Sequence, residues 1–229
     1  MKNKQLLEGM KDSIPIVLGY LPLGFAFGVL ATQVGMTLTQ STMMSVLCFT
    51  GAGQYIAIGI LQAGGAVLTI IIANILVNLR YLLFSTSLVP HLKNNIPTGI
   101  ATLLSYGVTD ETYAVAINHY QNHDATTSYM AGLNLTSHLG WILSTLLGAI
   151  CGTLITDTDR IGLNFALPAM YTCLLVLVST RRSDILVAAF TAVACLVIGY
   201  LIPASMLNLS NIIIATLLGA TVGVIFNGK

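Results

Sequence analysis

The distribution of charged side chains constrains this chain more than any other feature of its sequence. Residues 13–79 contain no Asp, Glu, Lys or Arg, and three further uncharged runs cover residues 125–156, 161–180 and 185–228. Because a helix needs about 20 apolar residues to cross the hydrocarbon core of a bilayer, these runs have the combined length of about seven membrane spans. A less apolar segment, residues 96–118, is a further candidate span. We therefore predict an all-α, polytopic membrane bundle with about 7–8 transmembrane helices.

Composition leaves little room for another fold class. Charged residues make up only 7% of the chain, whereas a soluble domain carries about 25%. The sequence also has no basic patch that would neutralise the phosphates of a nucleic acid. We predict a single integral-membrane domain over residues 1–229. The expected helices cover residues 13–31, 41–62, 66–88, 96–118, 128–153, 162–180, 185–203 and 209–226.

The lysines near the start of the chain predict its orientation. With eight spans and a cytoplasmic N-terminus, most Lys and Arg residues lie on the cytoplasmic side and only Lys93 and Arg160 lie opposite, as the positive-inside rule favours. Lys2, Lys4 and Lys11 are mixed with acidic residues, and no small-x-small cleavage site follows the first span. We interpret this segment as a cytoplasmic leader and not as a cleaved signal.

A weak internal repeat relates the two halves of the chain, residues 13–118 and 128–229. At an offset of 116 residues, Leu-Gly-Phe at 23–25 aligns with Leu-Gly-Trp at 139–141. Transporters are often built from such repeats, although Leu- and Gly-rich helices also match by chance. Eight full spans would make the repeat parallel, whereas a segment 96–118 that only re-enters the membrane would make it inverted. The sequence leaves both arrangements open.

Arg80 is the clearest polar residue within an otherwise apolar segment. An Arg at the centre of a membrane helix costs about 2.5–3.5 kcal/mol on insertion scales, so its presence needs a reason. Asn74 and Asn78 precede it with i,i+4 spacing and share one helix face. We interpret the three residues as substrate-binding, with Arg80 attracting a carboxylate or pairing with an acidic side chain. The alternative is an arginine that snorkels to the lipid headgroups.

Asp110 and Glu111 form the second polar group. On a helix, Tyr106, Thr109 and Tyr113 line one stripe with Asp110 beside it, and a polar stripe at membrane depth is expected to face a wet cavity or the bundle interior. Two adjacent carboxylates in a low dielectric resist being charged together, so we assign them to proton coupling and Tyr106 to substrate binding. The alternative is a shallow segment in which the acids only cap a helix at the interface.

The third polar group is the run Phe-Thr-Gly-Ala-Gly-Gln-Tyr at residues 49–55. Gly51 and Gly53 weaken a helix in the middle of the second expected span, and Gln54 adds an amide. An interrupted helix of this kind can hold a zwitterionic ligand, so we assign all three residues to substrate binding. The alternative is close helix packing by small residues.

Pro22 and Gly24 predict a kink or a helix break in the first expected span, because proline removes a backbone hydrogen bond. Gly24 also forms a small-xxx-small pair with Gly28, and Gly148 forms another with Gly152. Such pairs are typical of closely packed membrane helices.

Motifs for other activities are absent from the sequence. It has no phosphate-binding Gly-Lys-Ser/Thr loop and no nucleophile motif of a hydrolase, and its four cysteines lie in apolar segments, which indicates packing. His119 and His123 have i,i+4 spacing without further metal ligands. His138 is interpreted as a satisfied buried histidine, with a place in a proton path as the alternative. We predict no enzyme activity, no cofactor and no metal site.

Four of these segments match one family pattern in order and spacing. They cover residues 9–15 with 21–28, 49–55, 78–81 with 85–90, and 109–114. Through them the chain resembles the AzlC family, the large subunits of branched-chain amino acid exporters, over nearly its whole length. Gly53 departs from the family pattern, which has alanine or serine before the glutamine, and this difference bears on the size of the substrate.

The resemblance implies a function that composition alone does not show. Members of this family work with a small hydrophobic AzlD-like membrane subunit and export branched-chain amino acids, in some cases methionine, across the bacterial inner membrane. The proton gradient is the implied energy source, and a multi-pass location in the inner membrane is the implied localisation. The alternative is a non-transporting membrane assembly or regulatory subunit, whose polar residues only mediate contacts.

Overall fold

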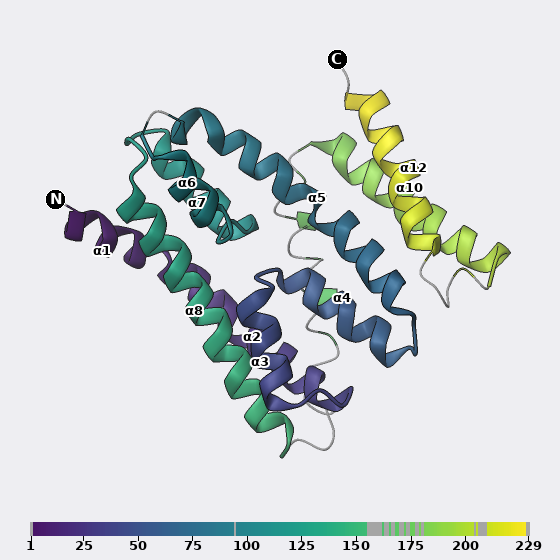
Figure 1. The fold of residues 1–229 in the computed structure, drawn as a ribbon. Coiled ribbons are helices and arrows are strands. Elements are labelled where there is room, and N and C mark those ends of the chain that lie inside the picture. The colour runs from purple at the N-terminus through teal and green to yellow at the C-terminus, as the bar shows by residue number, and fades with distance from the viewer. Residues whose placement is uncertain are drawn as a thin grey trace. The chain divides into compact units, whose positions relative to one another are not determined.

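The structure is a computed structural model that describes residues 2–93, 95–154, 181–203, 205 and 210–227, together with residues 162, 165, 168, 169, 172, 175, 176 and 179. Every regular element in this described part is a helix (Figure 1), which confirms the predicted all-α class. The expected helix 162–180 falls largely outside the described residues. The chain forms two compact units. Unit 1 comprises Met1–Ile58 with Asn74–Ala166, and unit 2 comprises Gly59–Ala73 with Leu167–Lys229.

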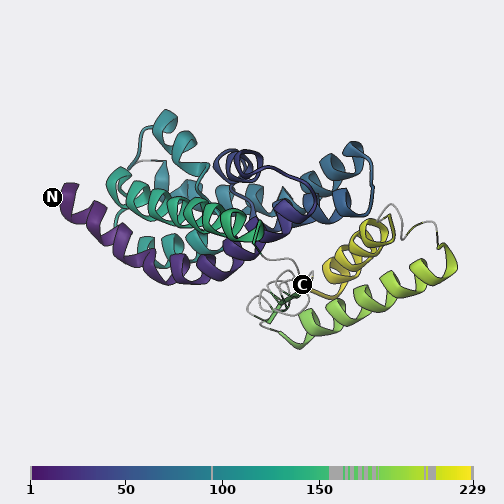
Figure 2. The same ribbon diagram turned by 90° about the horizontal axis from the view of Figure 1, so that it is seen from below.

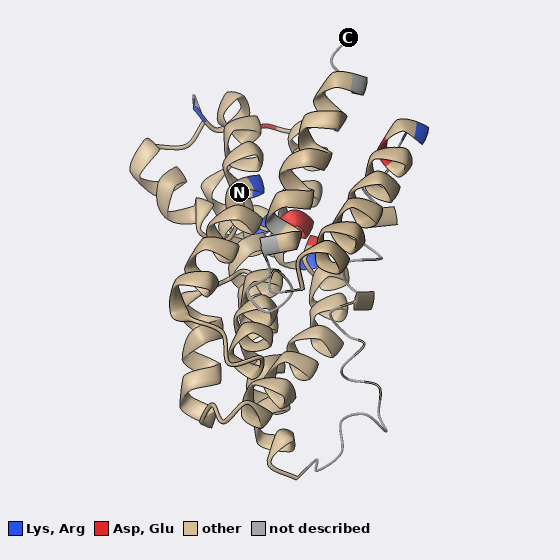
Figure 3. Ribbon diagram, turned by 90° about the vertical axis from the view of Figure 1, so that its right-hand side faces the viewer, with Lys and Arg blue, Asp and Glu red and all other residues tan. Residues whose placement is uncertain are grey.

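The helices of the described part are α1 (Lys2–Asp12), α2 (Ile14–Gln33), α3 (Leu38–Leu47), α4 (Gly51–Gln62), α5 (Val67–Leu92), α6 (Thr98–Ser105), α7 (Asp110–Tyr120), α8 (Thr127–Gly152), α10 (Arg182–Leu201) and α12 (Ser210–Asn227). Four of them, α2, α5, α8 and α10, are long and apolar enough to cross a membrane. Charged residues are sparse along these helices (Figure 3). A single domain over the whole chain stays a prediction.

Helices α1 and α2 pack along α8 in unit 1 (Figure 1 and Figure 2). Gly9, near the end of α1, faces the backbone of Tyr129 near the start of α8, and Gly148 faces the backbone of Phe25 further along, so α1 and α2 run in the same direction as α8. A Cβ on either glycine would collide with the opposite backbone. The packing role predicted for Gly148 is therefore confirmed, because only glycine permits this approach.

The expected helix 41–62 is not continuous. It is divided into α3 and α4 by the non-helical residues 48–50, and we call the pair hairpin A. The Thr50 hydroxyl accepts a hydrogen bond from the amide of Gly53 at 3.4 Å, as a residue that caps a helix N-terminus does. The predicted interruption is confirmed, and the prediction of one membrane-length helix here is wrong.

Contacts with α2 show that hairpin A folds back on itself. Helix α3 follows the end of α2 and runs back along it until Phe49 lies 6.0 Å from the ring of Tyr20. The chain then reverses, because the Tyr55 hydroxyl donates to the carbonyl of Leu23 at 2.7 Å and its ring packs against Phe27. The tip of hairpin A therefore lies beside the first half of α2.

The expected helix 96–118 is divided in the same way, into α6 and α7, which we call hairpin B. Its tip consists of residues 106–109, where Thr109 and Thr112 form a capping box at the start of α7. In a capping box the side chain of the N-cap residue and that of the third helical residue each accept a hydrogen bond from the other residue's backbone N–H, which marks the start of a helix. The prediction of a single helix is wrong for this segment also.

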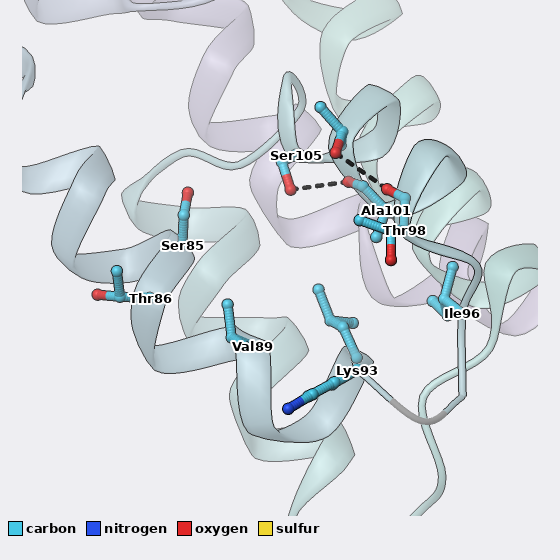
Figure 4. A pocket seen from close by; sticks show the side chains of 10 residues that line it. Ser85, Thr86, Val89, Lys93, Ile96, Thr98, Ala101 and Ser105 are labelled. Atoms are coloured by element: carbon cyan, nitrogen blue, oxygen red, sulfur yellow. Dashed lines mark hydrogen bonds between the residues drawn. The ribbon is translucent and has the colours of Figure 1, made fainter.

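Contacts with α5 give the direction of each arm of hairpin B. Helix α6 follows α5 and lines one hollow together with residues 85–93 (Figure 4), so it runs back along α5. Helix α7 runs forward again, because Tyr113 stacks on Phe84 with ring centroids 4.5 Å apart and Tyr120 lies 6.2 Å from His91. Both ends of hairpin B therefore lie near the C-terminal end of α5.

One end of unit 1 carries lysines from distant parts of the chain. Helix α7 is antiparallel to α2, since Glu111 contacts Tyr20 whereas His119 shares a hollow with Lys11. Helix α5 runs parallel to α7, so its C-terminal end, with Lys93, lies at the same end as Lys11. The eight-span arrangement expected these lysines on opposite sides of the membrane, whereas the structure brings them to one end of unit 1, because hairpin A turns back at residues 48–50. We call this end the lysine end.

Helix α2 runs without interruption through Pro22 and Gly24, so the predicted kink or break does not divide this helix, and a kink there stays a prediction. Gly24 lies tightly against Ser144 of α8, whose hydroxyl donates to the carbonyl of Tyr20 at 3.2 Å. Neighbouring helices commonly supply hydrogen bonds to backbone groups near an intramembrane proline. The close packing of α2 on α8 thus adds a hydrogen bond to the backbone of α2 two residues before Pro22.

In unit 2, α10 and α12 pack against each other, and Gly219 and Gly223 face Thr191 and Val187. The starts of the long helices follow the predicted repeat approximately: α8 begins 113 residues after α2, and α10 begins 115 residues after α5. The counterpart of hairpin A in the second half lies largely outside the described residues, so the repeat stays a prediction.

Candidate functional site

Arg80 lies at the centre of α5, 13 residues after Val67 and 12 residues before Leu92. About 18–20 Å of helix extends on either side of Arg80. The expected helix, 66–88, ended before Leu92 and therefore placed Arg80 too near its C-terminal end. Its Nη1 forms an ion pair with Oδ2 of Asp110 at 3.0 Å, and the two side chains are 27% and 18% exposed. The predicted pairing is confirmed, and α7 holds the guanidinium at mid-helix.

Asn74 and Asn78 turn the same face of α5 towards the tip of hairpin A. The Thr50 hydroxyl donates to Oδ1 of Asn78 at 2.7 Å, and Oδ1 of Asn74 occupies the space that a Cβ on Gly53 would need. The Tyr81 hydroxyl lies 3.5 Å from Oγ1 of Thr50. The side chains of Asn74 and Asn78 are therefore directed at the N-terminus of α4.

The two acidic residues leave α7 in different directions. Asp110 faces α5, whereas Oε2 of Glu111 accepts a hydrogen bond from the Tyr20 hydroxyl of α2 at 2.8 Å. Tyr20 also bonds to Oγ1 of Thr109, at 2.8 Å. The alternative interpretation expected the acids to cap α7, and the residue that caps it is Thr109. The cap lies beside Arg80, at the middle of α5 and away from its ends.

Two helix N-termini, those of α4 and α7, open near these charges. The first N–H groups of a helix have no intrahelical partner and carry partial positive charge. The Tyr81 hydroxyl reaches Thr50 at the start of α4, and the Tyr81 ring lies beside the guanidinium of Arg80. The region thus offers cationic groups to a carboxylate and anionic groups to an ammonium. A zwitterion requires both.

Gln54 is not brought to the Arg80–Asp110 pair. Its side chain is fully buried, its Nε2 donates to Oγ of Ser45 at 2.9 Å, and its Oε1 accepts from Nε1 of Trp141 at 2.8 Å. The Trp141 ring also lies against Gly51, where a Cβ would approach Cη2 at 2.9 Å. The glutamine and the glycine therefore hold α4 against α3 and α8.

Tyr106 and His138 cover the open carbonyl end of α3. The Tyr106 hydroxyl donates to the carbonyl of Val46 at 2.7 Å, and Nε2 of His138 lies 3.0 Å from the carbonyl of Ser45. The imidazole stacks on Phe49 with ring centroids 4.4 Å apart. Because Tyr106 belongs to the tip of hairpin B, its hydrogen bond joins the tips of the two hairpins.

A polar hollow of about 570 Å³ lies between α7 and the α1–α2 segment at the lysine end. Lys11, Asn118 and His119 are among its lining residues, and Val115 forms part of its wall. Val115 is one helical turn, about 6 Å, from Glu111 along α7. The polar hollow thus extends from the lysine end towards the acidic residues.

A second hollow, of about 250 Å³, lies between α5 and α6 (Figure 4). Lys93 lies at one end of it, Ser85 and Ser105 lie at the other, and Val89 lies between them. Ser85 is five residues, about 7.5 Å, from Arg80 along α5. This more apolar hollow ends between α5 and α6 without reaching the ion pair, since neither Arg80 nor Asp110 lines it.

Sequence reasoning missed Tyr20 and Thr50. A tyrosine in the middle of an apolar span needs a partner for its hydroxyl, which was the available signal for Tyr20. Thr50 precedes Gly51, so its position at a break made it a candidate N-cap. Tyr81 was also missed, and its ring lies 5.3 Å from Cζ of Arg80, within range of a cation–π contact.

Comparison with known proteins assigns the chain to a family through a region that includes this site. The sequence model of the family described as AzlC protein matches residues 15–155, which contain Tyr20, Arg80, Asp110 and Trp141. The chain belongs to the AzlC family. This membership confirms the resemblance found in the sequence, and it makes the chain a membrane protein of a transport family.

Three relatives illustrate the range of this similarity. Inner membrane protein YgaZ of Escherichia coli is 29% identical over 188 residues, which cover 80% of this chain and 77% of the relative. An uncharacterized membrane protein of Archaeoglobus fulgidus is 34% identical over 176 residues, 76% of each chain. Branched-chain amino acid transport protein AzlC of Bacillus subtilis is 27% identical over 163 residues, 69% of this chain and 62% of the relative. No solved structure matches.

Proposed function

We propose that this chain is the substrate-carrying subunit of a secondary transporter that exports branched-chain, hydrophobic L-amino acids across the bacterial inner membrane. The observation that carries the proposal is the ion pair between Arg80 and Asp110 at the centre of a membrane-length helix. Ionisable residues at that depth are costly and mark substrate or ion paths. The name of the Bacillus subtilis relative supports the substrate class.

In this proposal the polar end of the amino acid inserts between Arg80 and Asp110. The carboxylate takes its place beside the guanidinium, and the ammonium faces the carboxylate of Asp110. Asn74 and Asn78 lie six and two residues before Arg80, about 9 Å and 3 Å along the helix axis, and present amides at the open start of α4. Each charge of the zwitterion then has an opposite charge in the protein, which offsets the cost of taking it out of water.

The other residues assigned from the sequence shape the site. Gln54 and Gly51 fix α4 in place, Gly53 leaves room for Asn74, and Tyr106 joins the tips of the hairpins. Apolar side chains of the second hollow then meet the substrate side chain. Since one methylene changes affinity by only about 1–3 kcal/mol, selectivity among valine-, leucine- and isoleucine-like substrates should be loose.

In a bilayer, we expect α2, α5 and α8 to cross and the two hairpins to re-enter from opposite sides. Helices α3 and α4 have 10 and 12 residues, or about 15–18 Å of helix, which is roughly half of the 30 Å hydrocarbon core. Their tip and that of hairpin B then meet near the midplane, where transporters with broken helices hold their substrates. The lysine end is cytoplasmic by the positive-inside rule, as is the N-terminus.

The proton gradient supplies the energy in this proposal, with Asp110 or Glu111 as the group that binds the coupling proton. A small AzlD-like membrane subunit is the proposed partner, as the family resemblance implies. Transport then requires a complex of two subunits in the lipid bilayer, and no cofactor.

Leucine efflux from proteoliposomes that contain the chain with an AzlD-like subunit tests the function. Arg80→Ala should abolish efflux while the complex still assembles, because the carboxylate loses its cation. Lys4→Ala is the control, since it removes an exposed cation that lines neither hollow. Wild-type efflux by an assembled Arg80→Ala complex would instead favour a non-transporting assembly or regulatory subunit.

A further inference from the structure

The two acidic residues at the start of α7 have different partners. Asp110 is paired with Arg80 at 3.0 Å, so a proton on Asp110 would leave a guanidinium without its counter-ion at mid-helix, which is costly. Glu111 faces the neutral hydroxyl of Tyr20 at 2.8 Å. When Glu111 is protonated, no cation loses its ion-pair partner.

The hydroxyl groups beside Glu111 can satisfy both of its charge states. Tyrosine and threonine hydroxyls donate one hydrogen bond and also accept. When Glu111 is ionised, Thr109 donates to Tyr20 and Tyr20 donates to Glu111. When Glu111 is protonated, it donates to Tyr20, Tyr20 donates to Thr109, and Thr109 donates to Thr112 at 3.3 Å. Thr112 donates to the carbonyl of Gly107 in both states, so no hydroxyl loses its acceptor.

Water can approach Glu111 along one of the two hollows. The polar hollow between α2 and α7 ends one helical turn from Glu111, and charged or titratable groups at its mouth are Lys11, Asp12, His119 and His123. The more apolar hollow lies between α5 and α6 and is lined by no residue of α7. Of the two hollows, the polar one is therefore the approach that leads along α7 towards Glu111.

We infer that Glu111, together with Tyr20 and Thr109, carries the coupling proton and exchanges it through the polar hollow, while Asp110 remains the ionised partner of Arg80 or of the substrate ammonium. This inference rests on the proposed function. A proton from the outer side binds the Glu111 carboxylate, stays there as the site turns inward, and leaves to cytoplasmic water. Tyr20 of α2 contacts the Glu111 carboxylate directly, Asp110 precedes it on α7, and the nearest cation on α5, Arg80, is paired with Asp110 and not with Glu111.

The experiment compares two activities of the reconstituted complex on the same vesicles. The first is leucine transport driven by an imposed proton gradient, and the second is exchange of leucine for leucine without a gradient. Glu111→Gln should lose gradient-driven transport at least tenfold and retain exchange, whereas Asp110→Asn should lose both. Tyr20→Phe should slow gradient-driven transport roughly tenfold, because a hydrogen bond to a charged group contributes about that factor, with exchange within twofold of the wild type.

The ratio of the two activities does not depend on how much of a variant folds. Glu8→Gln, the same substitution at the other glutamate of the chain, should leave the ratio unchanged. Gradient-driven transport by Glu111→Gln, loss of both activities in equal proportion, or an unchanged ratio in Tyr20→Phe would each overturn the inference. Absence of leucine exchange in the wild-type complex would instead refute the proposed function.

Discussion

Removing one charge of the Arg80–Asp110 pair should destabilise the protein more than removing both. Asp110→Asn keeps the shape of the side chain and leaves the guanidinium of Arg80 without its ion-pair partner. The Nε of Arg80 already has no hydrogen-bond partner within the described residues. In the double variant Arg80→Gln with Asp110→Asn, neither charge remains to be solvated at mid-helix. We therefore expect the second substitution to restore part of the lost stability.

The size of this effect follows from the distance and the exposure of the pair. Loss of one partner costs about 3–5 kcal/mol for a buried pair, and an exposed pair contributes only about 0.2–1 kcal/mol. The side chains of Arg80 and Asp110 are 27% and 18% exposed, which is between these limits. We expect Asp110→Asn to cost about 2 kcal/mol and the two sites to be coupled by about 1.5 kcal/mol.

Thermal unfolding of the purified protein in detergent measures this difference. For a chain of this size about 1 kcal/mol shifts the midpoint by roughly 2–4 °C, so Asp110→Asn should lower Tm by about 4–8 °C. The exposed Asp124→Asn is the matched control and should leave Tm within about 1 °C. If the double variant loses the sum of the two single losses, the ion pair does not hold α5 to α7 and the reasoning is refuted.

Three further predictions concern packing, scaffold and topology. Gly148→Val should prevent folding, because a side chain there meets the backbone of α2, whereas Gly19→Ala has open space and should give a normal size-exclusion profile. Gln54→Leu should cost about 1–3 kcal/mol in thermal unfolding, since two buried polar partners lose their hydrogen bonds. Single cysteines in place of Lys11 and Lys93, in a cysteine-free background, should react with an impermeant reagent from the same side of the membrane. Labelling from opposite sides would contradict the hairpin arrangement.

Much of the candidate site could be predicted from residue chemistry alone. Arg80, Asp110 and the two asparagines stand out because apolar surroundings make their charges and amides costly, and the structure does bring the arginine and the aspartate together. Gln54 stands out for the same reason, yet its amide is satisfied inside the scaffold. Cost of burial identifies a polar group that needs a partner, and it does not say whether that partner is protein or substrate.

The amino-acid sequence alone determined the all-α class, the membrane as the surroundings of the chain, and one helix interruption, that beside the glycines of residues 49–55, because hydropathy and glycine act locally. Only the tertiary structure decided that both interrupted segments turn back, that α2 continues through Pro22, and that Asp110 and Glu111 face different helices. A turn in direction depends on contacts between residues distant in sequence, such as Tyr55 with Leu23 and Tyr113 with Phe84. Local patterns carry no record of such contacts.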